Sequence, residues 1–417
     1  TIAENVFIGR EPGYANFIHW SRLFRETRRI TNRLGINLDP RRIVRSLSVA
    51  EQQMVEIARA LSTESSMIIM DEPTSALTEN EVQQLLAIMR DLKSQGLSVI
   101  FITHHLEEAM SICDRLTVLR DGRLVGTQNT ANVVLDDVIR MMVGRSMSEL
   151  FQRTETHELG EVALRARDLS RSGTARDPNA IVLDNINFEV RCGEILGVAG
   201  LIGAGRTELA RVLFGADRFA RGEIEVNGRR VNIRSPRDAI RHGVGLVPED
   251  RKQQALFLAL AVRPNLSMAA LSRLLRLGDF VNTRAEQSLV HDYQRALNIH
   301  MASPEQRVSN LSGGNQQKVV IARWLALKPQ VLIVDEPTRG IDIAAKAEVH
   351  QLLDDLARQG IAVIMISSEL PEILSMSDRI ITIREGRLTG EFTRAEATEE
   401  KLMQAMALGQ VSRELEV

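Results

Sequence analysis

The sequence contains one long stretch twice. Residues 47–126 match residues 311–390 at a constant offset of 264, without a gap over 80 positions. Both copies carry the same acidic string, Asp71-Glu-Pro-Thr74 in the first and Asp335-Glu-Pro-Thr338 in the second. A chain of 417 residues is long enough for two or three domains. The repeat therefore predicts two similar domains in one chain.

Composition narrows the class of protein. Apolar residues make up 44% and charged residues 25% of the chain, as in soluble globular proteins. A net charge of −2 and an aromatic content of 4% argue against a nucleic-acid partner. The two cysteines, Cys113 and Cys192, have no metal or disulfide spacing, which fits a reducing cytosol. No apolar run approaches the ~18 residues that span a bilayer.

The second half has the pattern of a complete α/β domain. Apolar strands alternate with helical segments, and this alternation predicts a doubly wound parallel sheet. The expected strands are Val182–Val190, Glu194–Ala199, Val331–Val334 and Ala362–Ile366, and the expected helices include Thr207–Phe214 and Ala345–Arg358. We predict a domain over residues 162–408, a linker over 146–161 and a tail over 409–417.

The first half, residues 1–145, matches only the later part of that domain. Asn5 corresponds to Asn265, so Thr1 falls opposite about residue 261. We therefore expect the chain to be a fragment that lacks roughly 100 residues of its first domain, including a glycine-rich loop.

An arginine-rich segment runs from Arg22 to Arg45 and holds eight arginines. Two interpretations remain open for it. It forms a solvated helix face, or it contacts anionic lipid or a membrane partner.

A glycine-rich loop, Gly200-Leu-Ile-Gly-Ala-Gly-Arg-Thr207, follows an expected strand and opens an expected helix. This context favours phosphate binding, because glycines allow backbone N–H groups to approach the phosphates and the helix N-terminus adds its positive dipole. The residues that would hold the nucleotide are Gly200, Gly203, Ala204, Gly205, Arg206 and Thr207. The Thr207 hydroxyl would bind Mg²⁺. Arg206 stands where such loops usually have lysine, and a purely structural glycine turn is the alternative.

In each copy of the repeat, two carboxylates follow one apolar strand. Asp335 would hold Mg²⁺ and Glu336 would act as a general base toward water. Asp71 and Glu72 are their counterparts in the first copy. The alternative is that these acids only cap helices.

The string Leu311-Ser-Gly-Gly-Asn-Gln-Gln317, expected to open a helix at Gln316, resembles the signature motif of ATP-binding-cassette (ABC) ATPases. The whole motif set resembles the tandem ATPase subunits of bacterial monosaccharide importers of the ribose, galactose, arabinose and xylose type. That set is Gly200–Thr207, Pro248-Glu-Asp-Arg251, Leu311–Lys318, Asp335–Asp342 and Ser367-Ser-Glu-Leu370. The resemblance implies tandem P-loop NTPase domains of the α/β class, the first one incomplete, with ATP and Mg²⁺ as cofactors.

In that family each nucleotide lies between the phosphate loop of one domain and the signature motif of the other. The resemblance thus implies a consensus site formed by the absent first loop and by Asp71, Glu72, His104, Ser312, Gly313, Gly314, Asn315 and Asp342. The other site would use the Arg206 loop, Asp335, Glu336 and Ser48.

Departures from the family pattern collect at that second site. Val49 and Ala50 replace the two signature glycines, and Ser368 stands opposite His104. Thr78 stands opposite Asp342, and Glu249 replaces an expected glutamine. We expect one hydrolytic site and one site that binds ATP but hydrolyses it poorly. The alternative is a second site that is fully competent.

The implied function is to energise import of a monosaccharide through a membrane permease, at the cytoplasmic face of the bacterial inner membrane. The implied partners are a permease homodimer and an extracytoplasmic sugar-binding protein. Two alternatives are an inactive or regulatory nucleotide-binding fragment and a soluble tandem ABC protein that acts on ribosomes or DNA. The sequence does not name the sugar, and it offers no aromatic residue for adenine between Leu164 and Asn187.

Overall fold

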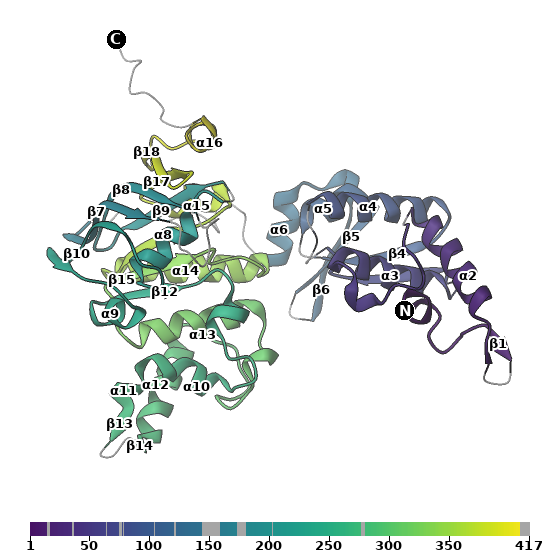
Figure 1. Ribbon diagram of the computed structural model, residues 1–417, viewed down its shortest axis with the longest axis horizontal. Helices are drawn as coiled ribbons and strands as arrows, with labels where there is room; N and C mark the ends of the chain where they lie inside the picture. The colour runs from purple at the N-terminus through teal and green to yellow at the C-terminus, as the bar shows by residue number, and fades with distance from the viewer. Residues whose placement is uncertain are drawn as a thin grey trace, which may run out of the picture. The chain divides into compact units, whose positions relative to one another are not determined.

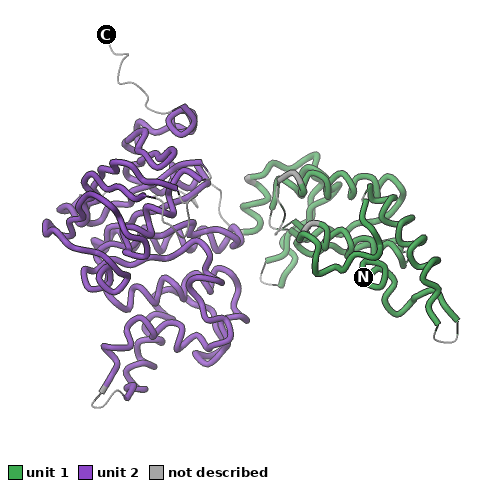
Figure 2. Tube along the Cα trace, in the orientation of Figure 1, with its two compact units in different colours: residues 1–146 green, residues 147–417 purple. Residues whose placement is uncertain are grey.

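The computed structural model divides into two compact units, Thr1–Ser146 and Met147–Val417 (Figure 2). His104, Thr78, most of the expected linker and the expected tail lie outside the described residues. The structure describes residues 1–14, 17–35, 37–63, 65–74, 77, 79–103, 105–120, 122–143, 159–172, 181–201, 203–276 and 280–408.

Unit 2 is built on a six-stranded sheet with the order β12-β15-β16-β9-β17-β18 (Figure 1). The first five strands run parallel and β18 pairs antiparallel with β17. The bounds are β12 Val244–Val247, β15 Val331–Asp335, β16 Ala362–Ile366, β9 Ile195–Gly200, β17 Arg379–Arg384 and β18 Arg387–Thr393. The predicted parallel α/β sheet is confirmed, because continuous apolar runs such as Ala362–Ile366 are buried on both faces.

Alternate residues of the central strands face two different cores. Leu332 and Val334 of β15 pack with helices α13 (Gly313–Leu325) and α14 (Ile343–Arg358). Val331 and Ile333 of the same strand pack with α8 (Arg206–Leu213) and a second sheet. Both faces of the sheet are therefore covered by other elements of unit 2.

The second sheet is antiparallel, with the order β11-β10-β7-β8. Its bounds are β11 Arg229–Val231, β10 Arg221–Val226, β7 Val162–Arg171 and β8 Leu183–Arg191. The remaining elements of unit 2 are α9 Pro236–Arg241, α10 Val262–Ser267, α11 Leu271–Leu274, β13 Leu275–Arg276, β14 Phe280–Val281, α12 Thr283–Ala296, α15 Leu370–Met376 and α16 Glu399–Leu408. Helices α10 to α13 gather on the side of unit 2 away from the second sheet (Figure 1).

One predicted boundary is wrong. The helix expected to open at Gln316 begins at Gly313, because Ser312 caps it and accepts a hydrogen bond from the Asn315 N–H. A serine cap three residues ahead satisfies a backbone donor of the first turn, so the helix starts inside the glycine pair.

Unit 1 repeats part of this architecture in smaller sheets. Parallel strands β3 and β4 pair with each other, and β5 pairs antiparallel with β6. Its elements are α1 Ile2–Val6, β1 Gly13–Tyr14, β2 Phe17–Ile18, α2 Trp20–Arg33, α3 Val49–Leu61, β3 Met67–Asp71, α4 Glu79–Ser94, β4 Ser98–Ile102, α5 Leu106–Ile112, β5 Arg115–Arg120, β6 Arg123–Asn129 and α6 Leu135–Val143. Within the described part of unit 1, no strand takes the place that β9 has in unit 2. Ile69 and Ile102 are 65% and 49% exposed, whereas their counterparts Ile333 and Ile366 pack with α8 and the second sheet in unit 2.

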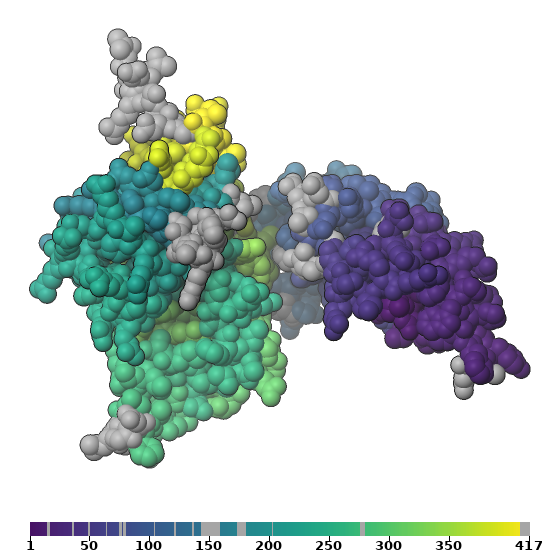
Figure 3. Space-filling view, viewed as in Figure 1, coloured from purple at the N-terminus to yellow at the C-terminus, as the bar shows by residue number. Residues whose placement is uncertain are grey.

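The first part of the arginine-rich segment lies in helix α2, which ends at Arg33 and buries Leu23, Thr27 and Thr31 on one face. Its arginines Arg22, Arg25, Arg28 and Arg29 are exposed. The neighbouring β1–β2 hairpin projects from the surface with Tyr14 87% and Phe17 81% exposed (Figure 3). These exposures fit a solvated helix face. No helix in the described residues is long and apolar enough to cross a membrane.

Candidate functional site

The glycine-rich loop connects β9 directly to α8. Gly203 and Gly205 have left-handed backbone angles, with φ of 81° and 107°. Residues with a side chain rarely adopt such backbone angles, so both positions require glycine. Gly205 is also the N-cap of α8, and it leaves the first N–H groups of that helix without a side-chain cap. The loop thus has the backbone shape that an anion at a helix N-terminus needs.

A turn between β17 and β18 supports this loop from behind. Gly386 donates its N–H to the Ala204 carbonyl at 2.8 Å, and its own carbonyl accepts from the Asp184 N–H at 2.9 Å. A Cβ on Gly386 would lie only 1.7 Å from the Val182 oxygen. This close approach gives a structural reason for the glycine that the repeat places here.

The acidic pair stands where β15 ends. Asp335 is 2% exposed, and Glu336 follows in the left-handed region with φ of 48°. Its N–H donates to the Ile366 carbonyl at 2.8 Å, across the end of β16. In unit 1, Glu72 has φ of 45° and its N–H donates to the Ile102 carbonyl, also at 2.8 Å. Such backbone strain is held only where the surroundings enforce it, and here both copies enforce the same turn.

The Arg206 side chain forms an ion pair with Glu336. Its Nη1 lies 3.4 Å from Glu336 Oε1, and the two side chains are 10% and 11% exposed. The Ser368 hydroxyl donates to Glu336 Oε2 at 3.1 Å. The structure therefore brings three predicted positions together: the residue that replaces lysine, the candidate base, and the residue opposite His104.

Burial sets the electrostatics of this cluster. It raises the pKa of Asp335 to about 6, against a hydrogen bond from Thr207 that lowers it, while the Glu336 charge raises it further. Burial also raises the pKa of Glu336, and the Ser368 N–H and the Arg206 charge oppose that shift. Desolvation disfavours the charged form of each acid, and the charge of Arg206 offsets only part of that cost.

Two buried atoms of the cluster have no hydrogen-bond partner within the described residues: Asp335 Oδ1 and Arg206 Nη1. Buried polar atoms without partners are rare and call for an explanation. A carboxylate oxygen and a hydroxyl beside it suit Mg²⁺, and a guanidinium N–H suits a phosphate oxygen. The residues present therefore fit a magnesium nucleotide.

The signature helix shows a second use for its glycines. A Cβ on Gly313 would lie 2.8 Å from Arg251 Nη2, and one on Gly314 would lie 2.5 Å from the Ala345 Cβ. Packing inside unit 2 thus requires these glycines, apart from any contact with phosphate. The first copy has Val49 and Ala50 there, and Glu81 in place of Ala345. Ser48 caps its helix as Ser312 does, within a capping box that includes Glu51.

Replacing Gly314 by alanine is expected to destabilise unit 2 by about 1–3 kcal/mol, because α13 and α14 must move apart to admit the new methyl group. Urea unfolding followed by the fluorescence of Trp324 measures the change. The double variant with Ala345→Gly removes the contact, so its loss should be smaller than the sum of the two single losses. A strictly additive pair would contradict the packing argument.

Arg251 is a residue whose role the sequence did not reveal. Its guanidinium is 9% exposed and donates to the carbonyls of Arg339 and Gly340 at 2.6 and 2.8 Å. Glu249, expected near the nucleotide, forms an ion pair with Arg339. Asp342, also expected there, caps α14 by accepting from the Ala345 N–H at 2.9 Å. These contacts hold the segment that follows Glu336.

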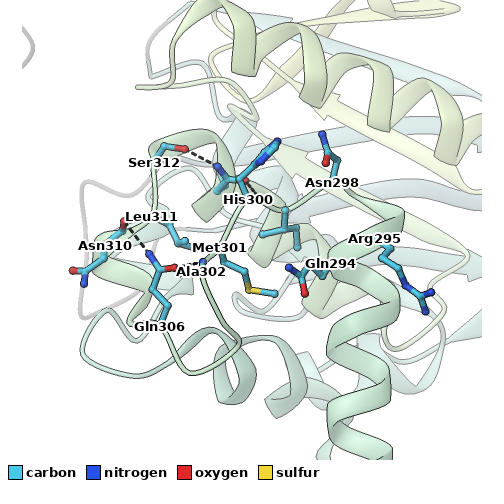
Figure 4. Close-up of a pocket in the computed structure, with 12 residues that line it drawn as sticks. Gln294, Arg295, Asn298, His300, Met301, Ala302, Gln306, Asn310, Leu311 and Ser312 are labelled. Atoms are coloured by element: carbon cyan, nitrogen blue, oxygen red, sulfur yellow. Dashed lines mark hydrogen bonds between the residues drawn. The ribbon is translucent and has the colours of Figure 1, made fainter. Parts of the chain in front are cut away.

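A surface pocket of about 750 Å³ opens beside Ser312 (Figure 4). The His300 N–H donates to Asn315 Oδ1 at 2.8 Å, and Asn315 Nδ2 donates to the Ser312 Oγ at 2.9 Å. Two expected nucleotide contacts are thus fixed to each other. Nothing in the sequence pattern pointed to His300 or to Met301, which also lines the pocket.

The remaining predicted residues divide between the units. Asp71, Glu72 and Ser48 lie in unit 1, and all other described site residues lie in unit 2. Asp71 is exposed, whereas its counterpart Asp335 is buried. His104 lies outside the described residues.

Comparison with known proteins agrees with this geometry. The model of the ABC transporter family matches residues 1–75 and 183–339. The chain is 45% identical over 411 residues to the ribose import ATP-binding protein RbsA of Geobacillus kaustophilus, covering 98% of this chain and 81% of that one. It is 48% identical over 407 residues to ribose import ATP-binding protein RbsA 2 of Streptomyces avermitilis, with 97% and 78% covered.

A third relative has a broader name. It is the putative ribose/galactose/methyl galactoside import ATP-binding protein of Rhizobium johnstonii, 48% identical over 408 residues, with 98% of this chain and 78% of that one covered. Identity at this level extends over both copies of the repeat. The chain therefore belongs to the ABC transporter family, within the group of import ATP-binding proteins to which these relatives belong.

Proposed function

We propose that this chain binds and hydrolyses ATP to energise the uptake of a monosaccharide of the ribose or galactose type through a membrane permease. Family membership supports ATP binding and hydrolysis, and the relatives' names support the sugar class. The observation that carries the proposal is the buried cluster of Arg206, Thr207, Asp335 and Glu336 at the end of the glycine-rich loop.

Within unit 2, Thr207 and Asp335 would hold Mg²⁺, which supplies positive charge to the phosphate oxygens. The loop N–H groups around Gly203 and Gly205 would bind phosphate. Glu336 would accept a proton from water at a carboxylate oxygen. Its ion pair with Arg206 favours the charged carboxylate but lowers its strength as a base, because a proton must then displace that pair.

We further propose that the two copies differ in activity. Glu72 would serve the consensus site together with His104, Ser312, Gly313, Gly314, Asn315 and Asp342, as the family resemblance implies. Glu336 would serve a site that hydrolyses slowly. The support is local: Arg206 and Ser368 both engage the Glu336 carboxylate, and no imidazole stands at position 368.

Replacing Glu72 by glutamine is expected to reduce sugar uptake, whereas Glu336→Gln should reduce it far less. Loss of Glu72 as a general base should slow the chemical step at its site roughly 100-fold or more. Slow turnover at the remaining Glu336 site should limit the fall in uptake of Glu72→Gln to about tenfold. The measurement is uptake of labelled ribose, galactose, arabinose and xylose by host cells whose own copy carries each variant.

The two variants control each other, because glutamine preserves the shape of each turn. Equal losses from both would contradict the asymmetry, yet leave sugar import standing. Unchanged uptake of every sugar in both variants would contradict the proposed function itself.

The proposed partners are a permease homodimer and an extracytoplasmic sugar-binding protein that reaches this chain through the permease. We place the chain peripherally, at the cytoplasmic face of the cell membrane. The segment from Glu249 through Leu256–Leu271 is the proposed point of coupling. In its favour, Phe257 is 57% and Leu260 45% exposed next to Arg251 and its loop.

A further inference from the structure

A buried polar network lies behind the acidic turn of unit 2. His350 of α14 and Glu372 of α15 meet at 2.6 Å between Nε2 and Oε1, with side chains 2% and 3% exposed. The Thr338 hydroxyl donates to the same oxygen at 2.9 Å. The Ser367 hydroxyl lies close enough to lower the pKa of Glu372. One carboxylate thus bonds to Thr338 and His350, and it also lies near Ser367.

The residues near Glu372 lie next to the residues that contact the candidate base, Glu336. Thr338 lies two residues after Glu336, and Ser367 immediately precedes Ser368, which donates to Glu336. The two segments also meet through the backbone, since the Glu336 N–H donates to the Ile366 carbonyl. Ser367 in turn accepts from the Glu369 N–H at 3.0 Å. Glu372 therefore joins both segments whose residues meet at the candidate base.

Unit 1 has the same parts without the histidine. Thr74, Thr103 and Glu108 stand at the positions of Thr338, Ser367 and Glu372, but Leu86 stands at that of His350. The Thr74 hydroxyl is buried and has no hydrogen-bond partner within the described residues, whereas the Thr338 hydroxyl donates to Glu372. The two copies thus differ at the position of His350, and also by Thr103 in place of Ser367.

Charge and burial agree with a stable pair in unit 2. Burial alone would raise the pKa of Glu372, but His350, Ser367 and Thr338 together hold that pKa below its ordinary value. The hydrogen bonds with His350 and Thr338 both go to Glu372 Oε1, and buried hydrogen bonds of this kind restrain the groups that they join.

We propose that His350 is a positioning residue: through Glu372 it fixes Thr338 and Ser367, and thereby holds Ser368 on Glu336. Unit 1, with leucine in this place, leaves its equivalent turn less restrained. The consequence for hydrolysis rests on the proposed function, but the restraint itself does not.

Hydrogen–deuterium exchange of the whole chain, resolved to single amides, tests the proposal. The informative amides are those of Glu336 and Glu369 in unit 2 and of Glu72 and His105 in unit 1. The His105 N–H donates to the Thr103 hydroxyl at 2.9 Å, as Glu369 does to Ser367. His350→Leu is expected to speed exchange at Glu336 and Glu369 about tenfold, while amides of β9 stay protected.

His350→Gln supplies the conservative variant, because its amide can still donate to Glu372 and should restore most of the protection. Unchanged exchange in His350→Leu would overturn the proposal. So would a uniform rise across unit 2 that glutamine does not correct, since that result would mean a purely structural loss. Glu372→Gln keeps the shape but weakens the hydrogen bonds with His350 and Thr338, so it should match His350→Leu at these amides.

Binding of magnesium ATP by the unaltered chain is measured alongside. A failure to bind would count against the proposed function alone, because the exchange pattern is recorded without nucleotide.

Discussion

Replacing Asp335 by asparagine should make unit 2 more stable and a much weaker binder of magnesium ATP. Burial raises the Asp335 pKa from 3.8 to about 6, a shift equivalent to about 3 kcal/mol against the charged form. Asparagine removes that charge at nearly the same size. It also removes an anionic oxygen that would hold Mg²⁺, so affinity for magnesium ATP should fall by about 100-fold.

The gain in stability should depend on pH in a defined direction. The folded state binds the Asp335 proton more tightly than the unfolded state does. Stability is therefore lost as pH rises from 3.8 to about 6, and the full cost is present above that range. The advantage of asparagine should be largest at pH 7.5 and nearly absent at pH 4. Urea unfolding at both values, followed by Trp324 fluorescence in a Trp20→Phe background, measures it.

The repeat supplies the matched control. Asp71 occupies the same place in unit 1 but is exposed, so Asp71→Asn should change the free energy of unfolding by less than about 0.5 kcal/mol. If Asp335→Asn destabilised unit 2 at pH 7.5, burial would not dominate this site. If it left magnesium ATP binding unchanged, Asp335 would not be a metal ligand.

The sequence predicted the parts of the fold that depend on local pattern. Continuous apolar runs located β15 and β16 to within one residue, because both faces of these strands are buried. The glycine-rich loop and the acidic pair were also located, since each needs fixed residue types at a fixed spacing. The start of α13 was predicted three residues too late. Glycine disfavours helix, so Gly313 and Gly314 did not indicate that the helix begins directly after its cap, Ser312.

What the sequence could not predict depends on contacts between distant segments. The pairing of Arg206 with Glu336 depends on how deep the loop lies and on the side-chain rotamer. Gly313 had an expected role toward phosphate, but its packing against Arg251 is visible only in three dimensions. The same holds for His350, which lies within the predicted helix Ala345–Arg358 but whose partners come from distant segments.

Loss of Arg323 is expected to destabilise unit 2 severely. This guanidinium is 7% exposed in α13, and burial lowers its pKa to about 10. Its Nε donates to the Asn265 carbonyl at 2.6 Å and Nη2 donates to Asn265 Oδ1 at 3.1 Å. Nη1 donates to the Ala255 carbonyl. One side chain thus donates to acceptors in two segments, at Ala255 and at Asn265, that precede α13 in the chain.

Methionine at position 323 would fill much of the volume but donate nothing. Buried acceptors left without donors cost about 1–3 kcal/mol each, so we expect a loss of roughly 3–5 kcal/mol in the free energy of unfolding. Asn265 also accepts from the Phe257 N–H at 2.9 Å, so the exposed segment around Phe257 should loosen first. Faster exchange of that amide than of amides in β15 would show this order.

Arg59 is the counterpart of Arg323 at the repeat offset, and it is exposed. Arg59→Met should therefore change stability by less than about 0.5 kcal/mol, although the substitution is chemically identical. Arg323→Lys should fall between, because one ammonium cannot reach all three acceptors of the planar fork. A loss below about 1 kcal/mol in Arg323→Met would mean that water replaces the guanidinium. The segment proposed to couple with the permease would then need another anchor to α13.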